Sequence, residues 1–186
     1  MSAYTPHTTN KKIALLIAVL AATLAFSEIL GKNAQTKAIN QNIEASNYWN
    51  FFQAKTIRKT TVQTDLQILE ALATLNLNGD ATDNKIKETI TSLKSEAERY
   101  ESEPEMKEGR KELAERAKKA EAISEKSLVA YHTFEYAAAF LEIAIVLTSA
   151  AVVTEIMSLL WLACGMGVLG AALCFMGVLF PTLLPL

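Results

Sequence analysis

Apolar residues gather in three long runs that are separated by a polar middle. The runs cover residues 13–30, 128–156 and 159–180. Each is long enough to cross a hydrocarbon core of about 30 Å at about 1.5 Å per helical residue. This pattern predicts an all-α membrane protein with three transmembrane helices, in which a large polar segment lies between the first and the second.

The polar middle is predicted to form a long antiparallel helical hairpin. Between residues 12 and 77 there is no proline and only one glycine, Gly31, so the first span should continue as a long polar helix. The stretch NLNGDATDN, residues 76–84, then has the composition of a turn. The arms on either side of this turn match in length, which favours a hairpin over a compact three-helix domain, the alternative arrangement.

The returning arm has the heptad spacing of a coiled coil. Thr82 or Asp83 is expected to cap its first helix, and Pro104 suits the first turn of a second helix, which predicts a kink near residues 102–105. The apolar positions spaced by three and four are Ile86, Ile90, Leu93, Ala97 and Tyr100, then Met106, Leu113, Ala117 and Ala120. These positions should pack against helices of the same chain or of a neighbouring copy.

The segment boundaries follow from these patterns. The first span has a basic start, but its apolar core is too long for a signal peptide and no small-x-small cleavage site follows, so we expect an uncleaved anchor. The predicted segments are a tail at 1–11, transmembrane helices at 12–31, 129–156 and 158–180, the hairpin at 32–128, and a tail at 181–186. Lys11 and Lys12 favour a cytoplasmic N-terminus, and hence an extracytoplasmic hairpin.

Each predicted span has a stripe of small residues, which is typical of transmembrane helices that pack closely. The stripes are Ala14, Ala18, Ala21 and Ala25; then Ala130, Ala137, Ala144 and Ala151; then Ala163, Gly167, Gly170, Cys174 and Gly177. We expect Ala137, Ala144, Gly167, Gly170 and Gly177 to pack helices together within a bundle and between copies. The alternative is that small residues are simply common in such spans.

Four ionisable residues form a candidate intramembrane polar or ion path. Glu28 and Glu135 lie near the ends of their spans, and His132 is one turn before Glu135. Glu142 is two turns deeper, where a carboxylate costs about 2.5–3.5 kcal/mol unless it is paired, hydrogen-bonded or neutral. Two interpretations stay open. Glu142 is protonated and forms a hydrogen-bonded clamp between helices, or these residues form a path for protons or cations.

Composition argues against several other functions. In residues 32–127 there are 16 basic and 16 acidic residues, so no basic face for nucleic acid is expected. The chain has two histidines and two cysteines without metal-binding spacing, no nucleophile–base set and no glycine-rich phosphate loop. We therefore expect neither an enzyme nor a cofactor, and we expect membrane lipids and further copies of the chain as partners.

Two stretches are similar to a known family. ASNYWNFFQAKTIRK, residues 45–59, resembles the Trp-x-x-x-Gln-Ala-Lys-x-Ile-Arg signature of domain of unknown function 4337, a family of uncharacterised bacterial membrane proteins. The signature positions are occupied by Trp49, Gln53, Ala54, Lys55 and Arg58. Residues 131–154 are similar to the family's second span. The resemblance implies a multi-pass protein of the bacterial cytoplasmic membrane and supplies no activity.

The signature residues also have a physical interpretation. Trp49 is too far from the first span for an interfacial position on a straight helix, so we expect these residues to serve packing or assembly. Lys55 and Arg58 are expected to pair with acids such as Glu112 or Glu115, and a ligand or lipid-headgroup site is the alternative.

The chain departs from the family in two places. The family tends to have glutamine in place of Glu142, which supports a clamp over an obligatory proton carrier. The family also has bases in the short connection where this chain has Glu155.

Taken together, the sequence predicts a self-associating structural or scaffolding membrane protein. The alternative function is an oligomeric ion or proton channel or transporter with a path past Glu142.

Overall fold

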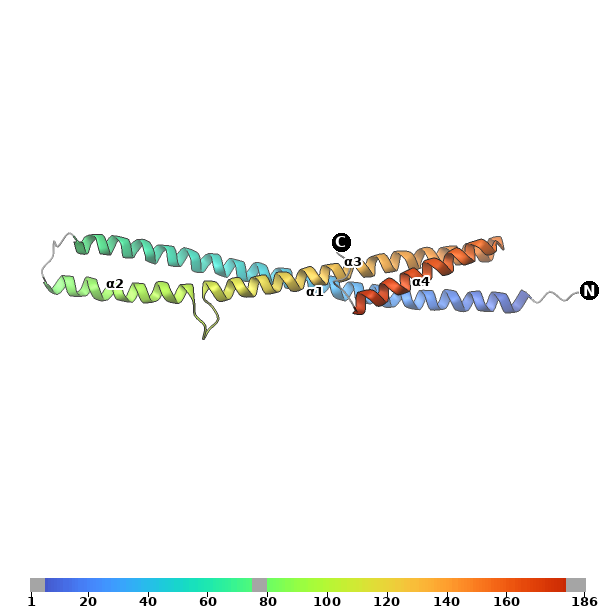
Figure 1. The fold of residues 1–186 in the computed structure, drawn as a ribbon, viewed down its shortest axis with the longest axis horizontal. Helices are drawn as coiled ribbons and strands as arrows, with labels where there is room; N and C mark the ends of the chain where they lie inside the picture. Colours follow the sequence, from blue (N-terminus) through green and yellow to red (C-terminus); the bar gives the residue numbers. More distant parts are fainter. Residues whose placement is uncertain (1–5, 75–79, 180–186) are drawn as a thin grey trace, which may run out of the picture. The chain divides into compact units, whose positions relative to one another are not determined.

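A computed structural model describes residues 6–74 and 80–179 of the chain. It contains four helices, α1 (Pro6–Thr74), α2 (Asp80–Glu101), α3 (Arg110–Thr154) and α4 (Met157–Leu179), as shown in Figure 1. The described residues include no β-strand. Helices α1, α3 and α4 are long and apolar enough to cross a membrane, so the predicted all-α class with three candidate spans is confirmed.

Helix α1 continues from its apolar part into its polar part without a break, as its lack of internal proline predicts. The predicted turn at residues 76–84 falls partly on residues 75–79, which lie outside the described residues. Helix α2 begins at Asp80, and the predicted cap at Thr82 or Asp83 falls on side chains that lie outside the described part of the chain.

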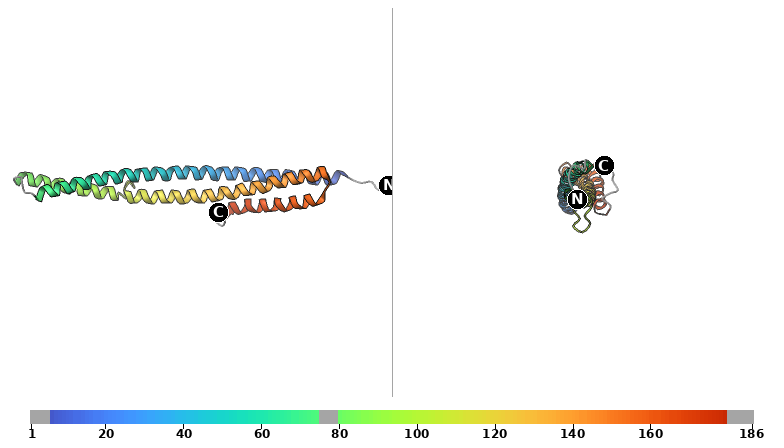
Figure 2. Two further views of the ribbon diagram at one scale, coloured as in Figure 1. Left: turned by 90° about the horizontal axis from the view of Figure 1, so that it is seen from above. Right: turned by 90° about the vertical axis from the view of Figure 1, so that its left-hand side faces the viewer.

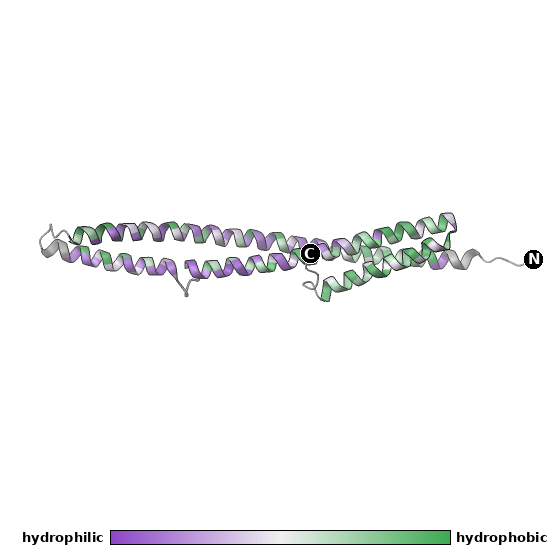
Figure 3. Cartoon of the chain, turned by 45° about the horizontal axis from the view of Figure 1, so that its top comes forward, coloured by the Kyte–Doolittle hydropathy of each residue, from purple (hydrophilic) through white to green (hydrophobic). Residues whose placement is uncertain are grey.

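The chain divides into two compact units, which we describe separately. The apolar unit consists of residues 1–40 and 123–186, and the polar unit consists of residues 41–122. Figure 3 shows that hydrophobic residues dominate α4 and the parts of α1 and α3 that belong to the apolar unit. Hydrophilic residues are interspersed with apolar ones along the polar unit.

In the apolar unit, α3 and α4 lie side by side (Figures 1 and 2) and α1 packs against both. One cluster joins Phe134 and Ala137 of α3 to Cys174 of α4, with Leu30 of α1 packed against it. A second cluster joins Leu20 of α1 to Leu141 and Ala144 of α3. Side chains from all three helices therefore contribute to both of these clusters.

The small-residue stripes of α3 and α4 are buried where the helices of the apolar unit pack, whereas the alanine stripe of α1 is exposed. The stripes of α3 and α4 are buried throughout, including Ala137, Ala144, Gly167, Gly170 and Gly177. Ala14, Ala18, Ala21 and Ala25 are exposed. Helix α1 instead turns a different set of residues inward, namely Leu20, Ser27, Gly31 and Ala38.

A tight turn connects α3 to α4, as the short connection in the sequence predicts. Glu155 has a φ angle of 56°, in the left-handed region that commonly ends a helix. The backbone N–H of Leu159 donates to the carbonyl of Ile156 at 3.2 Å. The two helices can therefore fold back on each other within two residues.

In the polar unit, residues 41–74 of α1 pack against α2 and against the first part of α3. The partners run in opposite order along the two segments: Glu70 pairs with Lys94, Lys59 with Glu101 and Trp49 with Glu121. Val62 and Leu66 form a core with Ala97, against which Ile90, Leu93 and Tyr100 pack. Four of the five heptad positions predicted on α2, Ile90, Leu93, Ala97 and Tyr100, therefore pack in the cluster with α1.

The returning arm is interrupted where the sequence predicts a kink near residues 102–105, but the interruption is a loop over residues 102–109 and α3 begins only at Arg110. Glu112 holds this loop by accepting hydrogen bonds from the Ser102 hydroxyl at 2.6 Å and from the Glu103 backbone N–H at 3.3 Å. These non-local bonds override the local preference of Pro104 for a first helical turn. Met106 consequently lies exposed in the loop and is not a heptad position.

Candidate functional site

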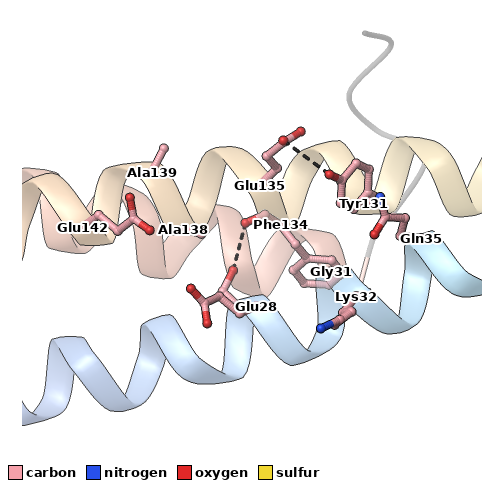
Figure 4. Close-up of a pocket in the computed structure, with 11 residues that line it drawn as sticks. Glu28, Gly31, Lys32, Gln35, Tyr131, Phe134, Glu135, Ala138, Ala139 and Glu142 are labelled. Atoms are coloured by element: carbon pink, nitrogen blue, oxygen red, sulfur yellow. Dashed lines mark hydrogen bonds between the residues drawn. The ribbon is translucent and has the colours of Figure 1, made fainter.

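A groove of about 370 Å³ lies between α1 and α3 of the apolar unit (Figure 4). Its polar lining residues are Ser27, Glu28, Lys32, Gln35, Tyr131, Glu135 and Glu142. Gly31, Phe134, Ala138 and Ala139 complete the lining. The groove therefore brings three of the four residues of the predicted polar path to one place.

A close approach of α1 and α3 positions the groove. The Ser27 hydroxyl is buried and donates to the Phe134 carbonyl at 3.0 Å. Gly31 faces the same residue, and a Cβ at this glycine would lie 3.2 Å from the Cβ of Phe134. Because larger side chains at Ser27 or Gly31 would push the helices apart, these two small residues set the spacing between the groove walls.

Glu28 on α1 and Glu142 on α3 line the groove from facing helices (Figure 4). Both side chains are exposed in the single chain. Among the described residues, none lies within hydrogen-bond or ion-pair distance of either carboxylate. Two carboxylates on predicted spans are thus left without a partner from residues 6–74 and 80–179.

Glu135 has local partners on its own helix. Its carboxylate accepts a hydrogen bond from the Tyr131 hydroxyl at 3.4 Å and lies 3.2 Å from Nδ1 of His132. His132 does not line the groove, so it reaches the polar path only through Glu135. Of the predicted face, Glu135 and Glu142 therefore line the groove, whereas His132 lies outside it.

Four polar residues of the groove were not among the predicted site residues, namely Ser27, Lys32, Gln35 and Tyr131. Lys32 and Gln35 follow Glu28 by four and seven residues, and this spacing places all three on one helical face. The same periodicity could have identified them. Tyr131 is one heptad before Ala138, which also lines the groove.

The signature residues of the polar unit divide between two faces of α1. Trp49 donates its indole N–H to Glu121 at 2.7 Å and packs edge-on against Phe52 at 5.4 Å. Lys55 lies over the Tyr100 ring at 5.5 Å. Gln53, Ala54 and Arg58 are exposed instead. Packing within the polar unit therefore accounts for Trp49 and Lys55 alone.

The predicted acidic partners of the signature bases are wrong. Lys55 lies 3.6 Å from Glu103 and 4.0 Å from Glu108, both of which belong to the loop. Glu112 is engaged by the loop itself, and within the described part of the chain no carboxylate lies at ion-pair distance from Arg58. The acidic partners of Lys55 therefore come from the loop at residues 102–109, which was not predicted from the sequence.

A network centred on Arg110 joins the loop to α1. Arg110 donates to Thr56 Oγ1 at 2.9 Å and to Glu101 at 2.8 Å, and its guanidinium lies 4.9 Å from the centre of the Phe52 ring. Lys59 reaches the same carboxylate of Glu101 at 2.8 Å. This hydrogen bond from Lys59 holds the pKa of Glu101 below its usual value. The Ser102 hydroxyl likewise lowers the pKa of Glu112.

These two carboxyl groups make the stability of the polar unit depend on pH. Their pKa values are lower in the folded chain than the ordinary value of 4.5, so their contribution is fully present above about pH 4.5 and is lost as the pH falls through the folded-state values. We expect the free energy of unfolding to fall as the pH decreases below about 4.5. Denaturant unfolding of the full chain in detergent, followed by circular dichroism, measures this fall.

The matched control is the double variant Glu101→Gln and Glu112→Gln, which removes both titrating groups. Its free energy of unfolding should decrease less over the same pH range. A decrease equal to that of the unmodified chain would show that other groups cause the acid sensitivity.

Comparison with known proteins identifies the family. The family described as Domain of unknown function (DUF4337) matches residues 9–180. The chain belongs to this family. The match to DUF4337 covers the groove and all signature residues, and it confirms the resemblance seen in the sequence. No curated protein and no solved structure matches the chain.

Metal-binding side chains do not gather in this DUF4337 protein within residues 6–74 and 80–179. No group of three or more histidine, cysteine, aspartate or glutamate residues there is arranged to hold a metal ion.

Proposed function

We propose that this DUF4337 protein is an integral membrane protein that self-associates into a structural or scaffolding assembly and has no enzymatic activity. In this proposal α1, α3 and α4 cross the bacterial cytoplasmic membrane, and residues 32–128 form an antiparallel, coiled-coil-like hairpin outside it. The N-terminus is cytoplasmic and the hairpin extracytoplasmic.

The position of Glu142 is the main support for self-association. It lies near the middle of a predicted span, is exposed in the single chain and has no partner among the residues that the structure describes. An unpaired carboxylate facing lipid costs about 2.5–3.5 kcal/mol. A second copy that covers the groove would remove Glu142 and Glu28 from lipid and would supply polar partners, of which Lys32 is one candidate.

Truncation of Glu142 tests this proposal. We expect the full chain in lipid nanodiscs to be a homo-oligomer by native mass spectrometry, and Glu142→Ala to weaken association by between roughly threefold and thirtyfold, the range of one interhelical hydrogen bond. Glu142→Gln should retain the oligomer, because an amide also forms hydrogen bonds. The control is Ile143→Ala, which alters an exposed apolar neighbour. A monomer at every protein concentration refutes self-association.

The groove also favours one alternative, an oligomeric ion or proton channel with a path past Glu142. It places Glu28, Glu135 and Glu142 around one open space, which is what a cation path requires. Proton and potassium flux into liposomes separates the two functions. Flux that Glu142→Gln abolishes supports the channel, whereas the scaffold predicts no flux from either protein.

A further inference from the structure

A second heptad repeat lies on the face of α1 that points away from α2 in the polar unit. We call it the outer seam. Its members follow spacings of four and three without interruption: Ile43, Asn47, Asn50, Ala54, Ile57, Thr61, Thr64, Ile68 and Ala71. The inner face of the same helix uses other residues, Ala45, Val62 and Leu66, which are buried.

The whole outer seam is exposed in the single chain. Its three isoleucines keep 55%, 67% and 54% of their surface accessible at Ile43, Ile57 and Ile68. Large apolar side chains that recur at heptad spacing on a solvated helix are the pattern of a helix that packs against another helix. No described residue of the chain covers this face.

The polar members of the outer seam are compatible with burial. Thr61 donates its hydroxyl to the Ile57 carbonyl at 3.1 Å, and Thr64 donates to the Thr60 carbonyl at 3.0 Å. Both donors are already satisfied within the helix, so covering them leaves no unpaired hydroxyl hydrogen. Only Asn47 and Asn50 would still need partners from the other side of an interface.

We propose that the outer seam packs against the outer seam of a second copy as a parallel, in-register coiled coil. The direction rests on the proposed function, because copies inserted into one membrane with the same orientation extend α1 from the same side. Two such helices run parallel and present identical residues at each level. The occupant of this face is therefore a second copy of the chain.

The asparagines support this register. In a parallel pair, Asn47 and Asn50 each lie opposite the same residue of the second copy. A side-chain amide both donates and accepts, so two identical asparagines satisfy each other. A slipped register would place an asparagine against isoleucine and leave it unpaired, and for this reason asparagine at such positions fixes register.

The residues that flank the outer seam place no like charges opposite each other in a parallel pair. One edge is uncharged throughout: Ser46, Gln53, Thr60, Gln67 and Thr74. The other edge contains Glu44, Phe51, Arg58, Asp65 and Leu72. In a parallel pair the uncharged edge of one copy faces the edge of the second copy that contains the charged residues, so no like charges lie opposite each other. The exposed signature residues Gln53, Ala54 and Arg58 thus all lie in or beside this interface.

Cysteine cross-linking of the full chain in liposomes tests the proposal. In a Cys164→Ala, Cys174→Ala background, Asn50→Cys and Ile57→Cys place a thiol in the outer seam. Gln63→Cys is the control, because Gln63 is exposed on the same helix but outside the seam. We expect seam cysteines to form disulfide-linked dimers at least about tenfold faster than the control, since they are held at contact distance.

The outcomes separate this interface from self-association in general. An oligomer by native mass spectrometry in which seam and control cysteines react equally refutes the seam but not the proposed function. The absence of any oligomer refutes the proposed function itself. A mixture of Ile57→Cys and Ile68→Cys chains that yields mainly the mixed dimer indicates antiparallel helices and overturns the parallel register.

A charge substitution provides a second, independent measurement. Ile57→Glu combined with Ile68→Glu should weaken association by at least about tenfold, because each places like charges opposite each other in the seam. Gln63→Glu should have no such effect. Helix content measured by circular dichroism should stay unchanged, because both isoleucines are exposed. Unchanged association of the double variant overturns the proposal.

Discussion

Gly170→Ala is expected to lower the free energy of unfolding of the apolar unit by roughly 1–3 kcal/mol. A Cβ at this position would lie 2.8 Å from Cγ of Leu141 and 3.0 Å from the backbone oxygen of Ala137. Leu141 is fully buried and the backbone oxygen cannot rotate away, so α3 and α4 must separate. Unfolding of the full chain in mixed micelles, followed by circular dichroism as the denaturing detergent is increased, measures the loss.

The same helix contains a matched control for this prediction. A Cβ at Gly165 would have no neighbour within 4 Å, so Gly165→Ala should be neutral or slightly stabilising through its higher helix propensity. Leu141→Ala combined with Gly170→Ala should cost less than the sum of the two single changes, because it removes one of the two clashes. Equal stability of Gly170→Ala and Gly165→Ala would show that this glycine does not set the helix spacing.

The two glycines also show what sequence periodicity can and cannot predict in apolar helices. The small residues of the α4 stripe are buried, whereas Gly165 lies off the stripe and is exposed. On α1 the alanine stripe was chosen, but Leu20, Ser27 and Gly31 face the other helices. When every face of a helix is apolar, composition alone does not distinguish the packed face from the others.

In the candidate site, some features follow from position in the sequence, whereas others depend on how distant segments pack. The distance of a residue from the ends of its span can be read from the sequence. This distance identifies Glu142 as the carboxylate that lies deepest in a predicted span. That Glu28 faces it across a groove depends on how α1 and α3 pack, which one sequence does not reveal. The loop at residues 102–109 is also non-local in origin, since Glu112 binds Ser102 from ten residues away.

Arg110→Ala is expected to lower the free energy of unfolding of the polar unit by roughly 1–3 kcal/mol. The substitution removes two charge-assisted hydrogen bonds, to Thr56 and Glu101, and the packing on the Phe52 ring. Because the network is only partly exposed to solvent, screening weakens it less than a surface ion pair. Denaturant unfolding of the full chain in detergent measures the change, and hydrogen exchange should show faster exchange in residues 102–109.

Two variants decide whether the Arg110 network acts through these contacts. Arg110→Lys keeps the charge but lacks the planar guanidinium group whose N–H groups reach Thr56 and Glu101 together. It should therefore recover only part of the free energy of unfolding that Arg110→Ala loses. Lys118→Ala removes an exposed positive charge elsewhere on α3 and should change little. A double-mutant cycle with Glu101→Gln should give a coupling energy between the two side chains. Full recovery by lysine, or a loss of the same size in Lys118→Ala, would mean that net charge and not the geometry of Arg110 holds the loop to α1.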